Sequence, residues 1–446
     1  MLSSLAPLLS SLAPSEAAPP AIDPANTAWM LVSTALVLLM TPALAFFYGG
    51  LVRSRSVLNT MMMSVASLGV VGLAWALLGY SLAFAPGAAL VGDVSFAGLT
   101  GVGLDAKGSI PHLLFFAYQG TFAIITAALI SGAVVERLRF AAYLLFIPLW
   151  TLLVYAPVAH WVWGGGWLSS VGALDFAGGT VVHINAAVAA LVAATMLKPR
   201  QDYGRQALLP HNVPFVLLGA GLLWFGWFGF NGGSALASDG LASLAFVNTM
   251  LAPAATLTTW MVLDLVRTGR PTAVGAGTGI VVGLVAVTPA AGFVSPVSAL
   301  ILGALAAVPS YYAIQWRRRS RLDDSLDVVA AHGLGGVVGA LLTGVFAQKA
   351  WGGQSGLLDG NGHQVLVQAA AVLATLAWSG VVSYGLLKLI DVTVGLRVDP
   401  RAEGLGLDRP LHAEEAYASD EGAILVLEES TTSHALSEPG VVPSRG

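Results

Sequence analysis

The sequence has 446 residues, of which 56% are hydrophobic and 10% are charged, and its net charge is −4. Soluble domains carry about 25% charged residues, so the composition excludes an ordinary water-soluble protein and indicates a polytopic membrane protein. The sequence contains no cysteine, which excludes disulfides, iron–sulfur clusters and thiolate metal sites. We expect the protein to contact the lipid bilayer and not to bind nucleic acid.

Residues 1–26 are rich in Ser, Pro and Ala and contain no Lys or Arg. Signal peptides normally begin with a basic region, which is missing here, although Ser15-Glu16-Ala17-Ala18 has the small residues of a cleavage site. The segment is therefore either a cleaved signal peptide or an exterior N-terminal segment.

From Thr27 onward, apolar runs of about 20 residues recur, each long enough to cross a hydrocarbon core of about 30 Å. They predict an all-α polytopic membrane protein with eleven transmembrane helices in a domain spanning 27–391. The predicted spans are 27–51, 57–84, 113–135, 140–161, 177–197, 213–230, 242–265, 273–293, 296–315, 327–347 and 364–391.

The basic residues between these spans predict the orientation of the chain. Arg53, Arg137 and Arg200 represent a set that falls in alternate connections, beginning with the first, whereas the other connections carry only Lys107 and Lys349. Because cytoplasmic loops are enriched in Lys and Arg, we expect the N-terminus outside and the C-terminus in the cytoplasm of a cell (inner or plasma) membrane.

Two histidines lie at related places in the predicted spans. His183 comes early in the fifth span and His332 early in the tenth, and these spans run in opposite directions. Each is preceded by an acid, Asp175 at eight residues and Asp327 at five. The pattern predicts two inverted five-helix repeats plus a final helix, with Asp327 as the acid of the second repeat.

The stretch from Asp175 to Asn185 combines an acid, a glycine pair and a histidine. If Asp175 caps the following helix, its carboxylate accepts first-turn N–H groups, and His183 lies about 12 Å deeper. An ionisable ring at that depth is costly unless a partner or a polar path receives it, which makes it a functional candidate. A packed histidine bonded to a carbonyl and a pair of haem ligands are the alternatives, and a visible spectrum would test for haem.

The stretch Asp175–Asn185, with Phe46–Leu51, Gly226–Asn231 and Asp391–Arg397, resembles the ammonium transporter (Amt/Mep/Rh) family, of the bacterial Amt type. The resemblance covers roughly residues 26–417. It implies a transporter without enzyme activity or cofactor, an eleven-helix protomer, a homotrimer, and a narrow pore through each protomer.

The resemblance also implies roles for single residues. His183 and His332 match the twin pore histidines, which implies that they contact each other, whereas hydropathy alone leaves His332 nearer the inner end of its span. Phe122, Trp163 and Ser234 match the residues that bind ammonium at the outer mouth. Phe122 and Phe230 match two stacked rings that gate the pore. Without the resemblance, Trp163 reads as an interfacial anchor and the phenyl rings as packing residues.

Three further residues are expected at the vestibule near the outer mouth. Tyr118 and Gln119 lie about one turn from Phe122 and are expected to line the vestibule. Asp175 is expected to shape the vestibule through the backbone donors that it accepts, with direct cation binding as the alternative.

The predicted function is uptake of ammonium by binding at the outer site, deprotonation, and passage of ammonia and a proton through a twin-histidine pore. Two neutral imidazoles that share one proton can both donate to and accept from ammonia. An ammonium sensor with little flux and a Rhesus-like ammonia gas channel are the alternatives.

Residues 392–446 are predicted to form a cytoplasmic regulatory tail. The segment Glu403–Tyr417 resembles the family's C-terminal regulatory motif, which implies a PII-type signalling protein as a partner at the cytoplasmic face. Ala413 stands where the family usually has Gly, and Ala tolerates a positive φ poorly. Beyond Tyr417 the chain is polar and is expected to be disordered.

Overall fold

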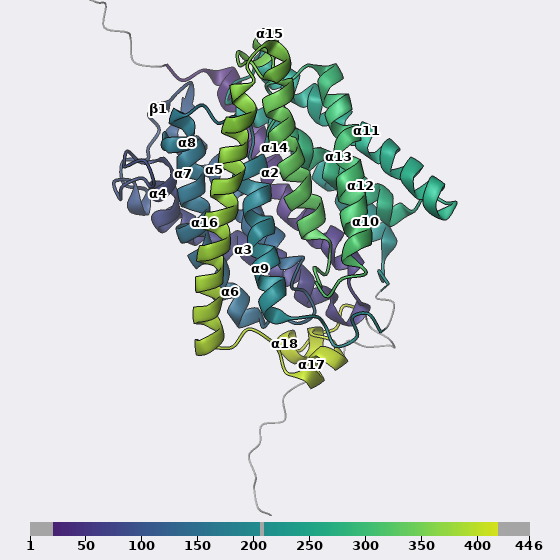
Figure 1. The fold of residues 1–446 in the computed structure, drawn as a ribbon. Helices are drawn as coiled ribbons and strands as arrows, with labels where there is room; N and C mark the ends of the chain where they lie inside the picture. The colour runs from purple at the N-terminus through teal and green to yellow at the C-terminus, as the bar shows by residue number, and fades with distance from the viewer. Residues whose placement is uncertain (1–20, 206–208, 418–446) are drawn as a thin grey trace, which may run out of the picture.

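The computed structural model describes residues 21–205 and 209–417. Residues 1–20 of the predicted N-terminal segment and the polar stretch after Tyr417 lie outside these ranges. Within them, ten helical segments are long and apolar enough to cross a membrane (Figure 1). The prediction of a helical, multi-span membrane protein is therefore confirmed.

The helices follow the predicted spans closely. The first half contains α2 (Pro24–Leu51), η2 (Ser54–Ser56), α3 (Val57–Ala74), η3 (Trp75–Gly79), α4 (Tyr80–Phe84), α5 (His112–Ser131), α6 (Phe140–Trp150), η5 (Thr151–Tyr155), α7 (Ala156–Val162), η6 (Gly179–Ile184) and α9 (Asn185–Leu197). The second half contains α10 (Val213–Gly232), α11 (Gly240–Thr268), α12 (Ala273–Val287), α13 (Pro296–Arg317), η8 (Val329–Leu334), α14 (Gly335–Phe346) and α16 (His363–Thr393).

Short elements connect these helices. They are η4 (Ala97–Leu99), α8 (Trp167–Ser170), η7 (Gly233–Ala235), α15 (Lys349–Gly352), η9 (Leu357–Asp359) and the antiparallel pair β1 (Ala106–Lys107) and β2 (Ile110–Pro111). Two further helices, α17 (Pro400–Leu405) and α18 (Asp408–His412), belong to the tail.

The predicted span 273–293 differs from the others. Its helix, α12, has 15 residues, and turns follow it. At 1.5 Å per residue this helix is about 22 Å long, which is shorter than a hydrocarbon core of about 30 Å. The count of eleven membrane-spanning helices therefore stays a prediction.

Small residues allow the helices to approach closely at the centre of the bundle. A Cβ atom on Gly219 of α10 would lie 2.4 Å from the backbone nitrogen of Phe47 of α2, and one on Gly303 of α13 would lie 2.2 Å from the carbonyl oxygen of Ala252. No real side chain tolerates such contacts, so glycine is required where these backbones meet.

The two histidine-bearing units run antiparallel to each other. Beyond the end of α9, Arg200 bonds Asp323, which precedes η8, with 2.9 Å between Nε and Oδ2. At the other end, Gln368 donates to the carbonyl oxygens of Leu174, which precedes η6, and Ala340 of α14. The start of each unit thus lies beside the end of the other, which is the arrangement that inverted repeats require.

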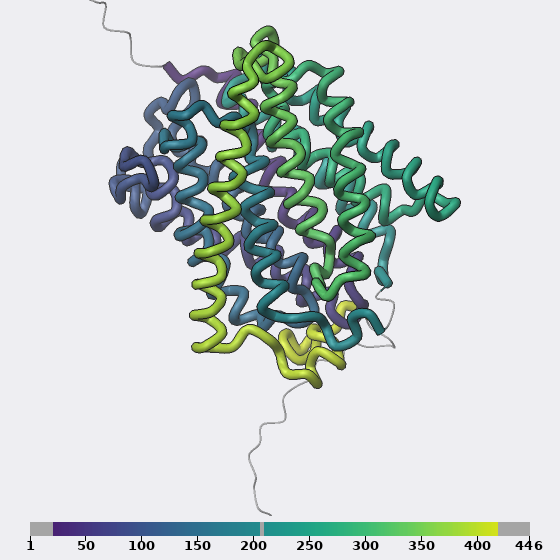
Figure 2. The backbone as a smooth tube through the Cα atoms, in the orientation of Figure 1, coloured from purple at the N-terminus to yellow at the C-terminus, as the bar shows by residue number. Residues whose placement is uncertain are grey.

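The tail packs against one end of the bundle, which we call the tail face. In Figure 2 the chain after α16 turns and runs across this end, opposite the end where α2 begins. Arg397 pairs with Glu403 at 2.8 Å, and the Asp408 carboxylate accepts from the backbone N–H of Asn59 at 2.8 Å. Ala413 adopts the left-handed conformation, with φ +55°, so the turn forms despite the missing glycine.

Candidate functional site

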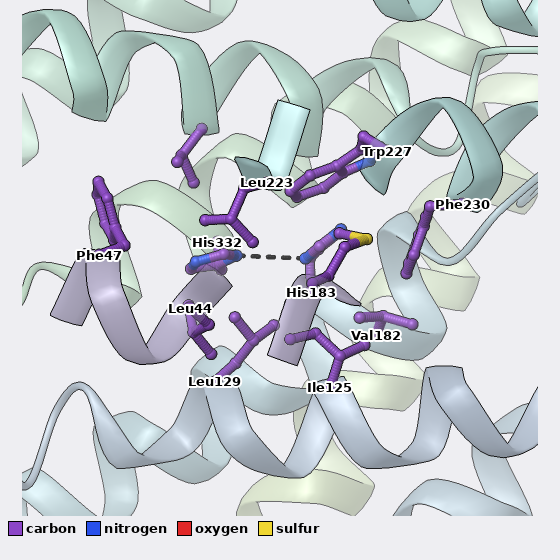
Figure 3. Close-up of a pocket in the computed structure, with 12 residues that line it drawn as sticks. Leu44, Phe47, Ile125, Leu129, Val182, His183, Leu223, Trp227, Phe230 and His332 are labelled. Atoms are coloured by element: carbon purple, nitrogen blue, oxygen red, sulfur yellow. Dashed lines mark hydrogen bonds between the residues drawn. The ribbon is translucent and has the colours of Figure 1, made fainter. Parts of the chain in front are cut away.

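A narrow cavity, which we call the pore, lies inside the helix bundle (Figure 3). The volume inside it that the centre of a water-sized molecule can occupy is about 10 Å³. Its walls are apolar except at His183, His332 and the indole of Trp227, and the other lining residues are Met40, Leu44, Phe47, Ile125, Leu129, Val182, Leu223, Phe230 and Val281. The histidines are therefore the main polar groups that a molecule meets there.

The two histidines contact each other inside this pore. Their Nδ1 atoms are 3.2 Å apart, the ring planes differ by 25°, and the side chains are 2% and 4% exposed. Hydropathy alone left His332 nearer one end of its span, whereas Figure 3 shows both rings between Phe47 and Phe230. The structure brings this predicted pair together.

The Nδ1 contact determines what the outer nitrogens can do. If one neutral ring donates its Nδ1–H, its Nε2 is an acceptor, and the ring that accepts carries its proton on Nε2. The pair then offers one acceptor and one donor to the pore. No hydrogen-bond partner for Nε2 of His183 is found among the described residues, so this atom is free to meet a molecule in the pore.

Asp175 fixes the start of the π-helical turn η6 that carries His183. Its two carboxylate oxygens accept from the backbone N–H groups of Gly178, Gly179, Thr180 and Val181 at 2.6–3.0 Å. Burial raises the pKa of Asp175, although these four N–H groups oppose the shift. Because the four donors engage both oxygens, the geometry favours the expected indirect role, in which the carboxylate shapes the backbone beside the pore.

In the second repeat the acid that corresponds to Asp175 is Asp324. The prediction of Asp327 for this role was wrong. Asp324 accepts from the N–H groups of Val328 and Val329 at 3.1 and 2.7 Å, at the start of the π-helical turn η8 that carries His332. Asp327 instead pairs with Arg317 at 2.5 Å. Asp324 precedes His332 by eight residues, the offset that separates Asp175 from His183, so the equal spacing was the signal to follow.

Trp227 also lines the pore, and no role for it is predicted from the sequence. Its ring stacks on His183 with 5.4 Å between ring centroids and an interplanar angle of 19°, and its indole N–H donates to the Thr288 hydroxyl at 2.9 Å. This stacking restricts the orientation of the His183 imidazole ring. The motif Gly226–Asn231 contains Trp227, but nothing in its spacing indicates a contact with His183.

Two phenyl rings separate the histidines from a second cavity. Phe122 of α5 and Phe230 of α10 stack with 4.1 Å between centroids and 23° between planes. The Phe230 centroid is also 6.0 Å from that of His183. The predicted gate residues therefore lie face to face between the histidines and the larger cavity.

That larger cavity, which we call the vestibule, lies toward the end of the bundle opposite the tail face. The volume inside it that the centre of a water-sized molecule can occupy is about 320 Å³. It is lined by Phe84, Phe115, Gln119, Phe122, Val162, Trp163, Phe176, Ser234 and Leu236. The three residues predicted to bind ammonium, Phe122, Trp163 and Ser234, thus share one cavity.

Hydrogen bonds to the backbone hold the polar and aromatic groups of the vestibule. The indole N–H of Trp163 donates to the carbonyl oxygen of Asp175 at 2.8 Å, and the Ser234 hydroxyl donates to that of Phe230 at 2.8 Å. The Ser234 oxygen therefore keeps acceptor capacity toward the cavity. Tyr118, expected at the vestibule, is instead fully buried and donates to the carbonyl oxygen of Phe230 at 2.8 Å.

A wide aromatic cavity, a stacked pair of rings and a narrow apolar pore with two buried histidines are features of a membrane channel or transporter for a small polar molecule. The model of the Ammonium Transporter Family matches residues 28–417. The chain is 49% identical to an ammonium transporter of Aquifex aeolicus over 403 residues, which cover 89% of this chain and 94% of that protein. An ammonium transporter of Bacillus subtilis is 46% identical, with 88% and 98% covered.

Solved structures share the fold. Mep2 of Saccharomyces cerevisiae superposes with a TM-score of 0.80 at 37% identity, covering 85% of this chain and 88% of that chain. A protein described as a sensor Amt protein superposes with a TM-score of 0.82 at 29% identity, covering 87% and 98%. The chain belongs to the Ammonium Transporter Family and is a multi-span membrane protein.

Proposed function

We propose that this protein takes up ammonium by binding the ion in the vestibule, removing a proton, and passing ammonia and a proton through the pore at His183 and His332. The observation that carries the proposal is the contact of two buried histidines within a narrow apolar pore, directly behind a stacked pair of phenyl rings. The names of the curated relatives as ammonium transporters support the same substrate.

The vestibule has the chemistry of a site for a small cation. The rings of Phe122 and Trp163 meet edge to face with 6.1 Å between centroids, and Ser234 adds an acceptor oxygen. A cation over an aromatic face gains about 0.5–2 kcal/mol, more as water is excluded. Ammonium would therefore concentrate in front of the phenyl gate.

Deprotonation follows from the contrast between vestibule and pore. An ion that enters an apolar pore without a counter-charge loses its hydration at a cost of several kcal/mol, whereas the cost for neutral ammonia is much smaller. Ammonia donates and accepts hydrogen bonds, and the histidine pair presents one acceptor and one donor. The gate rings exclude water and the histidines guide the neutral molecule and receive the proton.

The remaining parts of the proposal concern the cell. We place the protein in the cell membrane, with the vestibule and N-terminus outside and the tail face in the cytoplasm, because basic residues gather in the connections on the tail side. We also propose a homotrimer, and a PII-type signalling protein as the partner of the tail face. The protein acts as a transporter and not as an enzyme.

A sensor with little flux is the second candidate, since one similar structure is described as a sensor Amt protein. A Rhesus-like gas channel is the third, and the pairing of Trp163 with Ser234 in one cavity favours a site for the charged ion over it.

Currents on a solid-supported membrane test the three candidates together. Proteoliposomes receive an ammonium pulse, and empty liposomes serve as the control. A saturating transient current supports transport of charge after ion binding. No current with rapid ammonia flux supports the gas channel, and binding without either current or flux supports the sensor.

A further inference from the structure

One polar side chain in the vestibule has no structural explanation. Gln119 is 8% exposed, lines the cavity, and its Oε1 atom has no hydrogen-bond partner among the described residues. A buried amide oxygen without a hydrogen-bond partner destabilises the fold. An occupant of the cavity would satisfy this group.

Gln368 shows how a glutamine with a structural role behaves in this fold. It is buried as well, but it accepts from the N–H of Leu174 at 2.8 Å and donates to the carbonyl oxygens of Leu174 and Ala340 at 2.7 and 3.0 Å. Its amide holds three backbone groups of two segments. Gln119 makes no comparable contact with any residue that the structure describes, so packing does not account for an amide at this position.

The position of Gln119 on α5 directs it to the substrate. Phe115, Gln119 and Phe122 are spaced i, i+4 and i+7, so they lie on one face of the helix, and all three line the vestibule. On the opposite wall, Ser234 lines the same cavity from η7. An amide thus interrupts an aromatic stripe at the cavity where a cation would rest.

We infer that Gln119 is an ammonium-binding residue that supplies a second acceptor oxygen beside Ser234, and that it discriminates ammonium from methylated amines. The inference rests on the proposed outer site. Rotation of the terminal amide exchanges Oε1 and Nε2, so a cation in the vestibule turns the oxygen toward itself. Ammonium has four N–H bonds, and the cavity then offers two ring faces and two oxygens to receive them.

The chemistry predicts a difference between two substrates. Ammonium can donate to both oxygens while it faces both rings, whereas methylammonium has lost one N–H bond to a methyl group. Gln119→Met keeps the length of the side chain and removes the acceptor, and its apolar end accepts a methyl group. The ratio of apparent affinities should therefore shift toward methylammonium in this variant.

The test measures the concentration dependence of transport currents in proteoliposomes with ammonium and with methylammonium. Gln119→Met should lower apparent ammonium affinity about tenfold, as expected for loss of a hydrogen bond to a charged group, and lower methylammonium affinity less. Gln119→Glu keeps an acceptor oxygen and should keep at least wild-type affinity. Gln354→Met, at an exposed position outside the vestibule, is the matched control and should behave as wild type.

Three results would overturn the inference. They are unchanged ammonium affinity in Gln119→Met, an equal loss for both substrates, and an equal loss in Gln119→Met and Gln119→Glu, since the last two indicate disturbed packing. Trp163→Leu is measured in parallel. If it loses affinity while Gln119→Met does not, only this inference fails, whereas if neither variant loses affinity the proposed outer site fails as well.

Discussion

Trp163 connects the vestibule to the cap of the histidine helix. Its ring meets Phe122 edge to face, and its indole N–H donates to the carbonyl oxygen of Asp175, whose carboxylate holds the start of η6. The residue therefore has two separable parts, an aromatic face for the cation and a donor for the backbone. Trp163→Phe removes the donor alone, and Trp163→Leu removes both parts.

We expect Trp163→Leu to weaken apparent ammonium affinity by a factor that corresponds to about 0.5–2 kcal/mol, because leucine keeps apolar area but lacks the negative ring face. Trp163→Phe loses the same N–H but keeps a ring, so it should retain part of the affinity. The measurement is the half-saturating concentration of the current. Equal losses in both variants would assign the effect to the hydrogen bond and contradict the cation–π account.

Ala413 is strained in the tail. Its φ of +55° lies in the left-handed region, which costs about 1–2 kcal/mol for a residue with a Cβ atom. Ala413→Gly should stabilise the docked tail by about 0.5–1 kcal/mol after the greater freedom of glycine in the undocked chain is subtracted.

Hydrogen exchange of the segment 403–417 measures this effect. Ala413→Gly should slow the exchange, and Ala402→Gly, within helix α17, should accelerate it because glycine destabilises a helix. Faster exchange in Ala413→Gly would contradict the assigned strain.

The two π-helical turns are the elements that place the histidines, and each begins at a buried carboxylate. Burial, together with the neighbouring Asp327, raises the pKa of Asp324 to about 7, although the N–H groups of Val329 and Val328 and the charge of Arg317 oppose the shift. The folded protein therefore holds a proton on Asp324 at pH values where the unfolded chain has released it. The free energy of unfolding therefore falls as the pH rises from about 4 to about 7, because the unfolded chain ionises this carboxyl group more readily than the folded protein does.

Asp324→Asn cannot titrate and isolates this effect. The melting temperature of the wild type minus that of Asp324→Asn should fall by about 2 °C or more between pH 5 and pH 8, measured in detergent at one scan rate. A difference that increases with pH would show that the backbone donors stabilise the ionised carboxylate more strongly than burial opposes it.

The elements were largely predictable from the sequence because length, hydropathy and basic connections carry their signal. The first predicted span began at Thr27, and α2 begins at Pro24, where Asp23 caps it by accepting from the N–H of Asn26. The failures have physical causes. Asp327 precedes His332 by five residues, but the bonds of a cap depend on the local backbone path, which brings the carboxylate of Asp324 to the N–H groups of Val328 and Val329.

The pore depended on tertiary contacts that no local pattern encodes. The resemblance predicted that His183 and His332 meet, and hydropathy did not. Trp227 stacks on His183 from a helix 44 residues later in the chain, and no described residue supplies a hydrogen-bond partner for Oε1 of Gln119. Both depend on how α5, η6 and α10 pack, so they were visible only in the folded chain.

At the scale of the whole molecule, the tail joins distant parts of the tail face. Glu403 accepts from the N–H of Gln201 at 2.8 Å, Asp408 accepts from that of Asn59, and the hydroxyl of Tyr417 lies 2.9 Å from Nε2 of His211. These contacts reach the connection after α9, the first turn of α3 and the connection before α10. The tail is therefore placed to stabilise one arrangement of the loops at the proposed cytoplasmic mouth.

Truncation tests this role. A chain that ends before Glu403 should still assemble as the proposed trimer but carry less ammonium current, because it loses all three contacts. A chain that ends after Tyr417 keeps them and should carry wild-type current. Full current in the shorter chain would refute the coupling role, and size-exclusion chromatography with light scattering checks the assembly of both.

The central claim is that ammonia and a proton pass along the contact between His183 and His332. The most direct measurement is the ammonium-driven current of His183→Ala and His332→Ala in proteoliposomes, with the exposed His363→Ala as the control. We predict that each pore variant remains folded and carries a current at least about tenfold smaller than that of the wild type, while His363→Ala carries the wild-type current. Wild-type current in either folded pore variant would contradict the twin-histidine account.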